Sequence, residues 1–302
     1  MKLKSLINKK YLIENTEDDY EEFDIPKYSK EAKEKQALAS IMKMLKQKHI
    51  KGDLNLSNSK IESLGNVETV NGNLNLENTS IKSFKNLQSI SGNLNLRYTE
   101  IESLGNLQSV GGWLDLFSCK KLESLGNLQS VDGYLNLYGC KKLESLGNLQ
   151  SVDGYLNLYG CKKLESLGNL QSVGGYLNLK YTSIESLGSL KNVDDDLYLE
   201  NTPIKSLGNL QSVDGYLYLG NIPIKSLENL QSVGGNLNLR YTEIESLGNL
   251  QSVGGYLDIS STLITSLENL KEINGYIYIS RYMAGKINIP EHLKNKIYML
   301  QH

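Results

Sequence analysis

The chain has 302 residues, of which 39% are hydrophobic, and its 32 basic and 34 acidic side chains give a formal net charge of −2. A charge this close to zero provides no strong field toward nucleic acid or an anionic membrane, so neither is an expected partner. No apolar run reaches the roughly 18 residues of a membrane span, and the first ten residues lack the apolar block of a secretory signal. We therefore expect a soluble cytoplasmic protein, or a virion-associated one if a phage encodes it.

Cysteine and histidine usage limits the chemistry that the chain can perform. Cys119, Cys140 and Cys161 are spaced 21 residues apart, which is unlike the short spacing of zinc or redox motifs. We expect free thiols, no bound metal and no cofactor. The three histidines all lie outside the middle of the chain, so no histidine is available there as a general base.

Two elements are predicted before the repeats. Residues 1–28 place a basic stretch before an acidic one, which is typical of a flexible charged tail. Residues 29–50 are predicted to form an N-terminal capping helix, because Leu38, Ile41 and Leu45 lie on one helical face. The first coil of a solenoid needs such a cap, since its apolar row is otherwise exposed.

Residues 51–285 are predicted to form a repeat solenoid of about twelve units. A Leu-x-Leu segment recurs from Leu54 to Ile277 at eight gaps of 20 residues and three gaps of 21. With the first Leu as position 1, apolar residues occupy positions 1, 3, 8, 11, 14 and 17. One unit cannot bury these side chains, but stacked units align them as columns of one core. Leu-x-Leu is the predicted strand, with positions 0, 2 and 4 facing outward.

The segment L-x-L-x-x-(Asn, Thr or Cys)-x-(Leu or Ile) resembles the core signature of leucine-rich repeats over about residues 52–290. The 21-residue units, where Cys replaces Thr, are similar to that family's C-x-x-L variant. The resemblance implies a right-handed horseshoe that is mainly β, with a parallel concave sheet and a mostly non-helical far side. The Leu-Pro pair of the short bacterial class is missing, so its effector role is not carried over.

Residues 286–302 are predicted to cap the other end of the solenoid. This C-terminal cap contains Ile287, Ile289, Leu293, Ile297 and Met299. We expect these apolar side chains to cover the last coil.

Comparison of the units with one another separates scaffold from variable positions. Position 10 is Ser in all eleven complete units, and position 13 is Asn in ten of them. A hydroxyl and an amide at turns can bond to main-chain groups that would otherwise be buried without a partner. Both columns are therefore predicted to be structural ladders.

The outward positions of the central strands are aromatic and predict a binding surface, because rigid amphipathic rings are favoured at interfaces. The predicted ligand-binding residues are Trp113, Phe117, Tyr134, Tyr138, Tyr155, Tyr159 and Tyr176, with Asn136 and Asn157 as hydrogen-bonding partners. A purely structural ladder is the alternative, since stacked tyrosines suit strands. Residues 120–140 recur identically as 141–161, so duplication could have copied the rings without a ligand.

The sequence thus predicts a non-enzymatic binding scaffold that recognises a protein, or a glycan, and is monomeric without its partner. The alternative is a structural component of a virion or cell-surface fibre, attached through residues 1–28. Hydrolysis of a sugar by Asp115 and nearby acids is disfavoured, because a repetitive face does not give two carboxylates the different environments that this chemistry requires.

Overall fold

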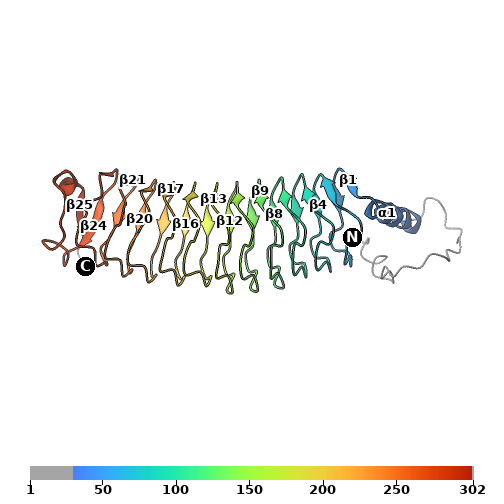
Figure 1. Cartoon of the computed structure of the whole chain (residues 1–302), viewed down its shortest axis with the longest axis horizontal. Coiled ribbons are helices and arrows are strands. Elements are labelled where there is room, and N and C mark those ends of the chain that lie inside the picture. Colours follow the sequence, from blue (N-terminus) through green and yellow to red (C-terminus); the bar gives the residue numbers. More distant parts are fainter. Residues whose placement is uncertain (1–29, 301–302) are drawn as a thin grey trace.

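The computed structural model describes residues 30–300. In this range the chain forms one α-helix, α1 (Lys30–Leu45), followed by a straight stack of coils that carries two parallel sheets (Figure 1). The charged tail predicted for residues 1–28 lies outside the described residues. Within residues 30–300, no helix has both the length and the apolar character needed to cross a bilayer.

The first sheet contains the predicted Leu-x-Leu strands, and we call it the Leu-x-Leu sheet. Its 13 strands run parallel, and each pairs with the equivalent strand of the next coil. The strands are β2 (Leu54–Asn55), β4 (Leu74–Asn75), β6 (Leu94–Asn95), β8 (Leu114–Asp115), β10 (Leu135–Asn136), β12 (Leu156–Asn157), β14 (Leu177–Asn178), β16 (Leu197–Tyr198), β18 (Leu217–Tyr218), β20 (Leu237–Asn238), β22 (Leu257–Asp258), β24 (Ile277–Ser280) and β25 (Ile297–Leu300).

The second sheet was not predicted, and we call it the Ser-Val sheet after positions 16 and 17 of the unit. Its 12 strands also pair in parallel. They are β1 (His49–Lys51), β3 (Thr69–Asn71), β5 (Ser89–Ile90), β7 (Ser109–Val110), β9 (Ser130–Val131), β11 (Ser151–Val152), β13 (Ser172–Val173), β15 (Asn192–Val193), β17 (Ser212–Val213), β19 (Ser232–Val233), β21 (Ser252–Val253) and β23 (Glu272–Ile273).

This second sheet makes the far side more regular than the mostly non-helical chain that was predicted there. Val152 points inward and is buried, whereas Ser151 points outward, which is the alternation of a strand. Two residues are too short an alternation to be recognised in a sequence. The single concave sheet of a leucine-rich-repeat horseshoe is not confirmed, because two sheets line a straight stack (Figure 1). A mainly β repeat solenoid with parallel strands is confirmed.

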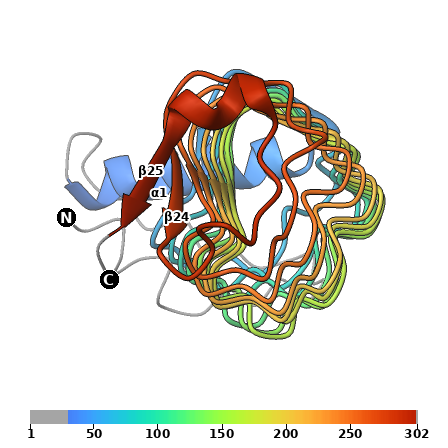
Figure 2. The ribbon, with the colours of Figure 1, turned by 90° about the vertical axis from the view of Figure 1, so that its left-hand side faces the viewer.

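Main-chain hydrogen bonds hold each coil to the next in a constant register. Leu135 pairs with Leu156 in the Leu-x-Leu sheet, and Val131 pairs with Val152 in the Ser-Val sheet. Between the coil of Leu135 and the coil of Leu156, the N–H of Leu135 donates to the carbonyl oxygen of Tyr155 at 2.9 Å. Viewed end-on, the coils superimpose closely (Figure 2). Equivalent residues of successive coils therefore form columns along the stack.

The six predicted apolar columns form the core. In the coil that begins at Leu135, every member of these columns is at most 1% exposed; the members are Leu135, Leu137, Leu143, Leu146, Leu149 and Val152. Position 6, which is Thr or Cys in all complete units except those with Ser59 and Ile222, forms a further inward column. The hydroxyl of Thr182 donates to the carbonyl oxygen of Leu179 at 2.8 Å, so this column also contributes hydrogen bonds to the turn.

The 21-residue units absorb their extra residue in the turn after the Leu-x-Leu strand. Gly139 adopts a φ of 74°, in the left-handed region that glycine enters without steric cost. After it, the N–H of Leu143 donates to the carbonyl oxygen of Cys140 at 3.2 Å and closes the added residue into a turn. Both sheets consequently keep their register across units of different length.

The Ser and Asn columns are structural ladders, as predicted. In ten of the eleven units the serine hydroxyl at position 10 accepts the N–H of position 12 at 2.9–3.2 Å. The side chain of Asn106 donates to the carbonyl oxygen of Lys85 at 2.8 Å, one coil earlier. Adjacent serines such as Ser103 and Ser124 also form parallel bridges, which give the coil a third line of main-chain contact.

The two ends of the stack are covered to different degrees. Leu45 in the last turn of α1 is buried, and Ile41 packs against the core, while the rest of α1 leads away from the coils (Figure 1). The capping role of this helix therefore stays a prediction. At the other end, η2 (Glu291–Lys296) places Leu293 in the core.

One residue of the predicted C-terminal cap does not cover the core. Met299 pairs with Ile279 of β24 and continues its inward column, but it is 53% exposed. The reason is that no described coil lies beyond β25.

The three cysteines are buried free thiols in the described structure, in agreement with the sequence. The thiol of Cys140 donates to the carbonyl oxygen of Leu116 in the preceding coil at 3.3 Å. Burial raises the pKa of Cys119 to about 11 and that of Cys161 to about 12. Because the thiolate is the reactive form, these thiols are chemically silent in the folded chain.

We expect Ellman's reagent at pH 8 to label none of the three thiols in the folded protein and all three after denaturation. Because the pKa values are raised in the folded state, the stability that the neutral thiols contribute is complete below about pH 9 and declines as the pH rises toward 11. Thermal unfolding monitored by circular dichroism between pH 8 and 11 measures this decline. Stoichiometric labelling of the native protein would contradict the buried column.

Candidate functional site

Two rows of aromatic side chains run along the outer face of the Leu-x-Leu sheet, on either side of position 2. The first aromatic row, at position 0, consists of Trp113, Tyr134, Tyr155 and Tyr176, and the second aromatic row, at position 4, consists of Phe117, Tyr138 and Tyr159. The parallel register brings these residues together, since equivalent positions of adjacent strands lie about 4.8 Å apart. The structure therefore gathers all seven predicted aromatic residues on one face.

The rings in each row are stacked face to face. The ring centroids of Tyr134 and Tyr155 are 4.6 Å apart with an interplanar angle of 3°, and those of Tyr155 and Tyr176 are 4.7 Å apart at the same angle. In the second row, Tyr138 and Tyr159 are 5.0 Å apart at 2°. Stacking at these distances is within the range where aromatic pairs attract one another.

Stacking leaves ring edges and hydroxyl groups, rather than ring faces, for contact with a partner. Tyr138 is the most exposed of the seven at 38%, and the other six are half-buried. Both ends of the second row are closed by rings set edge-on, Tyr98 against Phe117 and Tyr181 against Tyr159. The two rows thus form rigid ridges of ring edges.

The asparagine column between the rows is committed to the main chain. The Oδ1 atom of Asn136 accepts the N–H of Tyr138 at 3.2 Å, and that of Asn157 accepts the N–H of Tyr159 at 3.1 Å. These bonds end the strand in a local side-chain turn. The oxygen atoms that were predicted to accept hydrogen bonds from a ligand are therefore already used, and the amide nitrogen of Asn136 also donates to Asp115 at 3.1 Å.

Asp115 replaces asparagine in this column and is also held by its neighbours. It is 4% exposed, accepts the N–H of Phe117 at 2.9 Å and the amide of Asn136 at 3.1 Å, and lies 3.4 Å from Nη1 of Arg97. Burial raises the pKa of Asp115, and the bond from Phe117 and the charge of Arg97 oppose that rise. A carboxylate engaged in this way acts as part of the scaffold.

One more pair of stacked rings lies next to the two rows. It was not among the binding residues predicted from the sequence. The rings of Tyr198 and Tyr218 are 5.0 Å apart at 7°, and the hydroxyl of Tyr198 donates to Asp196 at 2.7 Å. Both residues occupy position 2, where most coils have asparagine, so a change of residue type in that column was the available signal. Tyr176 meets Tyr198 edge-on and connects this pair to the first aromatic row.

Burial within the rows affects the acidity of the phenols. Burial, with a smaller contribution from neighbouring Tyr134 and Tyr176, raises the pKa of Tyr155 to about 12. Burial also raises the pKa values of Tyr134, Tyr176 and Tyr198. These hydroxyls are thus neutral donors and acceptors at physiological pH. Among residues 30–300, no group of three or more metal-binding side chains lies close enough to hold an ion.

The model of one protein family, described as Toastrack DUF4097, matches residues 37–219, which is more than half of the chain. This range begins within α1 and includes both aromatic rows. No curated protein and no solved structure matches the chain.

We expect an alkaline titration followed at 295 nm to separate buried from exposed phenols. At pH 11 the folded protein should show fewer ionised tyrosines than the unfolded chain, because the raised pKa of Tyr155 preserves its neutral form until about pH 12. The stabilisation by the neutral rings is complete below about pH 10 and is lost as the pH rises through 12. Tyr155→Phe should remove one late-titrating phenol. Coincident folded and unfolded curves would refute the stacked rows.

Proposed function

We propose that this chain, which belongs to the Toastrack DUF4097 family, is a non-enzymatic scaffold that binds a partner protein through its two aromatic rows. The observation that carries this proposal is the presence of both rows on one face of the stack. The outer positions of the Ser-Val sheet bear small side chains instead, such as Ser130, Ser151 and Ser172. A ladder needed only for stability would have no reason to favour one sheet.

The stacked geometry suits recognition of a protein. Binding normally costs the conformational freedom of the side chains that become ordered, and rings already held by their neighbours have little freedom to lose. Tyrosine and tryptophan are also the side chains that most often dominate the energetics of protein interfaces. A glycan fits less well, because sugars pack against open ring faces, and Tyr134, Tyr155 and Tyr138 use theirs within the rows.

The repetition of the surface supports a role other than catalysis. Residues 120–140 and 141–161 are identical, so they present the same side chains in nearly the same surroundings. A catalytic centre needs one asymmetric set of groups with different roles. Asp115, the acid considered from the sequence, is held by Phe117 and Asn136 instead of facing a ligand.

Further parts of the proposal concern the ends of the stack and the setting. The packing of Ile41 and Leu45 supports α1 as the cap of the first coil. The unpaired thiols support a cytoplasmic location, or a virion if a phage encodes the chain. We propose that the resemblance to leucine-rich repeats extends only to the Leu-x-Leu segment. We also propose that the chain is monomeric without its partner.

The straight stack favours a second candidate, a rod that acts as a spacer in a virion or cell-surface fibre (Figure 1). In that case length is the useful property and attachment falls to residues 1–28. The aromatic rows would then be purely structural.

The test is affinity capture from the native host with the unaltered chain and three altered forms of it. In the first variant Tyr134, Tyr155 and Tyr176 are changed together to Phe, which removes hydroxyls but keeps the stacked rings. We expect this variant to bind the partner about tenfold or more weakly, because each of the three lost hydroxyl hydrogen bonds contributes about 0.5–1.5 kcal/mol. The matched control changes Tyr241, Tyr276 and Tyr282 to Phe and should bind normally, because these exposed residues do not contact either row.

The third form lacks residues 1–28. If the deletion abolishes partner binding while the first variant binds normally, the scaffold proposal is wrong. The chain would then act as a spacer that is attached through residues 1–28. Circular dichroism of each form ensures that the comparison is between folded proteins.

A further inference from the structure

Three lysines border the second aromatic row, and all three are added residues. Each 21-residue unit has two consecutive lysines after its cysteine, and the second of them directly precedes a core leucine. The residue at position 7 precedes the core Leu or Ile in the same way in a 20-residue unit, so the first lysine of each pair is the extra one. We call Lys120, Lys141 and Lys162 the added lysines, and all three are exposed.

The added lysines occur in the same three coils as the second aromatic row. From Leu54 to Ser280, position 4 is aromatic only at Phe117, Tyr138 and Tyr159, and these residues belong to the three 21-residue units. A longer turn does not require lysine, because any residue supplies the added length. Rings and positive charge therefore coincide along one edge of the Leu-x-Leu sheet.

One of these coils has diverged from the other two without losing either feature. Residues 113–133 differ from residues 134–154 at four positions, all of them between 113 and 118. Two of the changes lie in the aromatic rows, where Trp113 and Phe117 stand in place of tyrosine, and both keep a ring. The lysine pair is unchanged. Duplication alone thus does not account for the combination.

The charges of the added lysines are not neutralised within residues 30–300, where none of their ammonium groups forms an ion pair or a side-chain hydrogen bond. The second lysine of each pair does form one: Nζ of Lys121 lies 3.1 Å from Glu100, and Nζ of Lys142 lies 2.8 Å from Glu123. The added lysines follow one another at a strand spacing of about 4.8 Å. Like charges at this spacing repel one another, so an anionic ligand would relieve the repulsion.

An open strip of small residues lies between the second aromatic row and the added lysines. It consists of Ser118, Gly139 and Gly160 at position 5. A Cβ on Gly160 would meet no atom within 4 Å, and one on Gly139 would meet only Oγ of Ser118 at 3.9 Å. The left-handed backbone does not itself require glycine at this position, because Ser118 and Tyr181 adopt it with φ values of 59° and 60°. The two glycines therefore keep the strip open.

Tyrosines close both ends of this strip. Tyr98 and Tyr181 occupy position 5 in the adjacent coils and lie edge-on against Phe117 and Tyr159. They are four strand spacings apart, about 19 Å, which is the length of about six extended residues. Lys120 follows Phe117 by three residues, so their Cα atoms are at most about 11 Å apart. The strip is thus long and narrow, with ring edges on one side and ammonium groups on the other.

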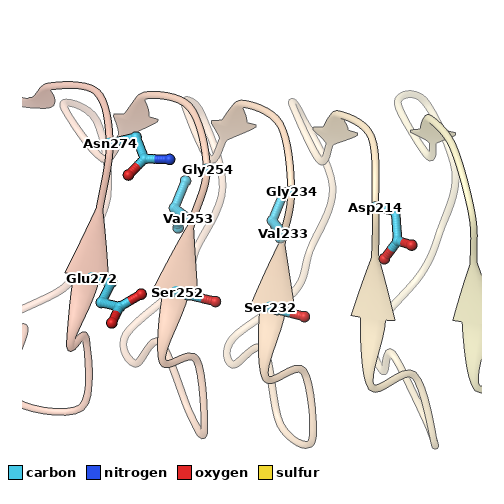
Figure 3. A pocket seen from close by; sticks show the side chains of 9 residues that line it. All are labelled: Asp214, Ser232, Val233, Gly234, Ser252, Val253, Gly254, Glu272 and Asn274. Carbon is cyan, nitrogen blue, oxygen red and sulfur yellow. The ribbon is translucent and has the colours of Figure 1, made fainter.

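A hollow on the Ser-Val sheet lacks this combination. It has a volume of about 320 Å³, and its lining contains the acids Asp214 and Glu272 but no aromatic residue (Figure 3). Exposed charges without an adjacent apolar surface contribute little to affinity. The strip beside the second aromatic row offers both kinds of contact.

The stacking of the rings favours a peptide over the other common polyanion, nucleic acid. Single-stranded nucleic acid binds by stacking its bases on open ring faces. Tyr138 lies between Phe117 and Tyr159, at centroid distances of 5.1 and 5.0 Å, so both of its faces are covered. A peptide needs only ring edges for its apolar side chains and ammonium groups for its carboxylates.

We infer that the strip binds an acidic segment of the partner protein, with carboxylates at the added lysines and apolar side chains against the edges of the second aromatic row. The inference rests on the proposed function, because the strip borders that row, and it adds the chemistry of the partner. An extended segment with alternating acidic and apolar residues presents one kind to each side of the strip.

The test uses an acetylated peptide of sequence Glu-Leu-Glu-Leu-Glu-Leu with a neutral fluorophore at its C-terminus. The full chain is titrated into it at low ionic strength and binding is followed by fluorescence anisotropy. We expect saturable binding. The dissociation constant should rise about tenfold when the added lysines are all changed to Gln, because three exposed ion pairs, each worth about twofold to threefold, are lost.

The matched control removes the same charge from exposed positions outside the strip, by Lys60→Gln, Lys82→Gln and Lys85→Gln. It should change the dissociation constant less than twofold. A further variant, Gly139→Tyr with Gly160→Tyr, fills the strip without changing the charge and should weaken binding about tenfold. Circular dichroism checks that each variant is folded.

Absence of saturable peptide binding, or equal weakening by the two lysine variants, would overturn the inference. Lysine-dependent binding of oligodeoxythymidine that is tighter than that of the peptide would assign the strip to nucleic acid and also overturn it. Residues 14–24 of this chain are themselves acidic. If deletion of residues 1–28 tightens peptide binding about tenfold, the strip belongs to that stretch instead of a partner.

Affinity capture separates failure of this inference from failure of the proposed function. If the variant without the added lysines retains a partner that is lost when Tyr134, Tyr155 and Tyr176 are changed to Phe, the inference is wrong and the proposed function stands. Loss of the same partner by both variants supports the acidic segment.

Discussion

The structure depends on one constraint: every coil must present its main-chain donors and acceptors in register with the next coil. In the Leu-x-Leu sheet the N–H of Leu156 donates to the carbonyl oxygen of Tyr176 at 2.9 Å. At the Ser-Val sheet the N–H of Asp153, directly after β11, donates to the carbonyl oxygen of Val131 in β9 at 3.0 Å. A parallel register repeats whatever side chain the unit carries at each position. Core leucines, buried thiols, turn serines and surface rings consequently all occur as columns, with stability that is approximately a sum over neighbouring coils.

The same constraint makes the aromatic rows both structural and available for binding. Tyr155 stacks on Tyr134 and Tyr176 because parallel strands place equivalent rings at stacking distance. Those contacts stabilise the coil and also fix the ring edges in place. The surface therefore offers a partner an ordered set of hydroxyls, and the two roles coexist in the same residues.

The parts predicted from sequence were those with a long, repeated signal. The phase of Leu-x-Leu placed the Leu-x-Leu strands from β2 to β24, and the spacing of Trp113, Tyr134 and Tyr155 indicated that their rings meet. The Ser-Val sheet was missed because its strands, such as β11, have two residues and no periodicity of their own. The bonds from Asn136 and Asn157 to their own strands could not be separated in sequence from bonds to a ligand.

The central claim is that coil register, rather than any particular side chain, specifies this fold. Deleting residues 141–161, an identical copy of residues 120–140, joins Cys140 to Lys162 and preserves the phase of every column. Thermal unfolding followed by circular dichroism should then show a cooperative transition within a few degrees of the full chain. Deleting residues 141–151 breaks the phase and should abolish that transition or lower it severely. Unfolding of the in-phase deletion, or normal folding of the out-of-phase one, would contradict the account.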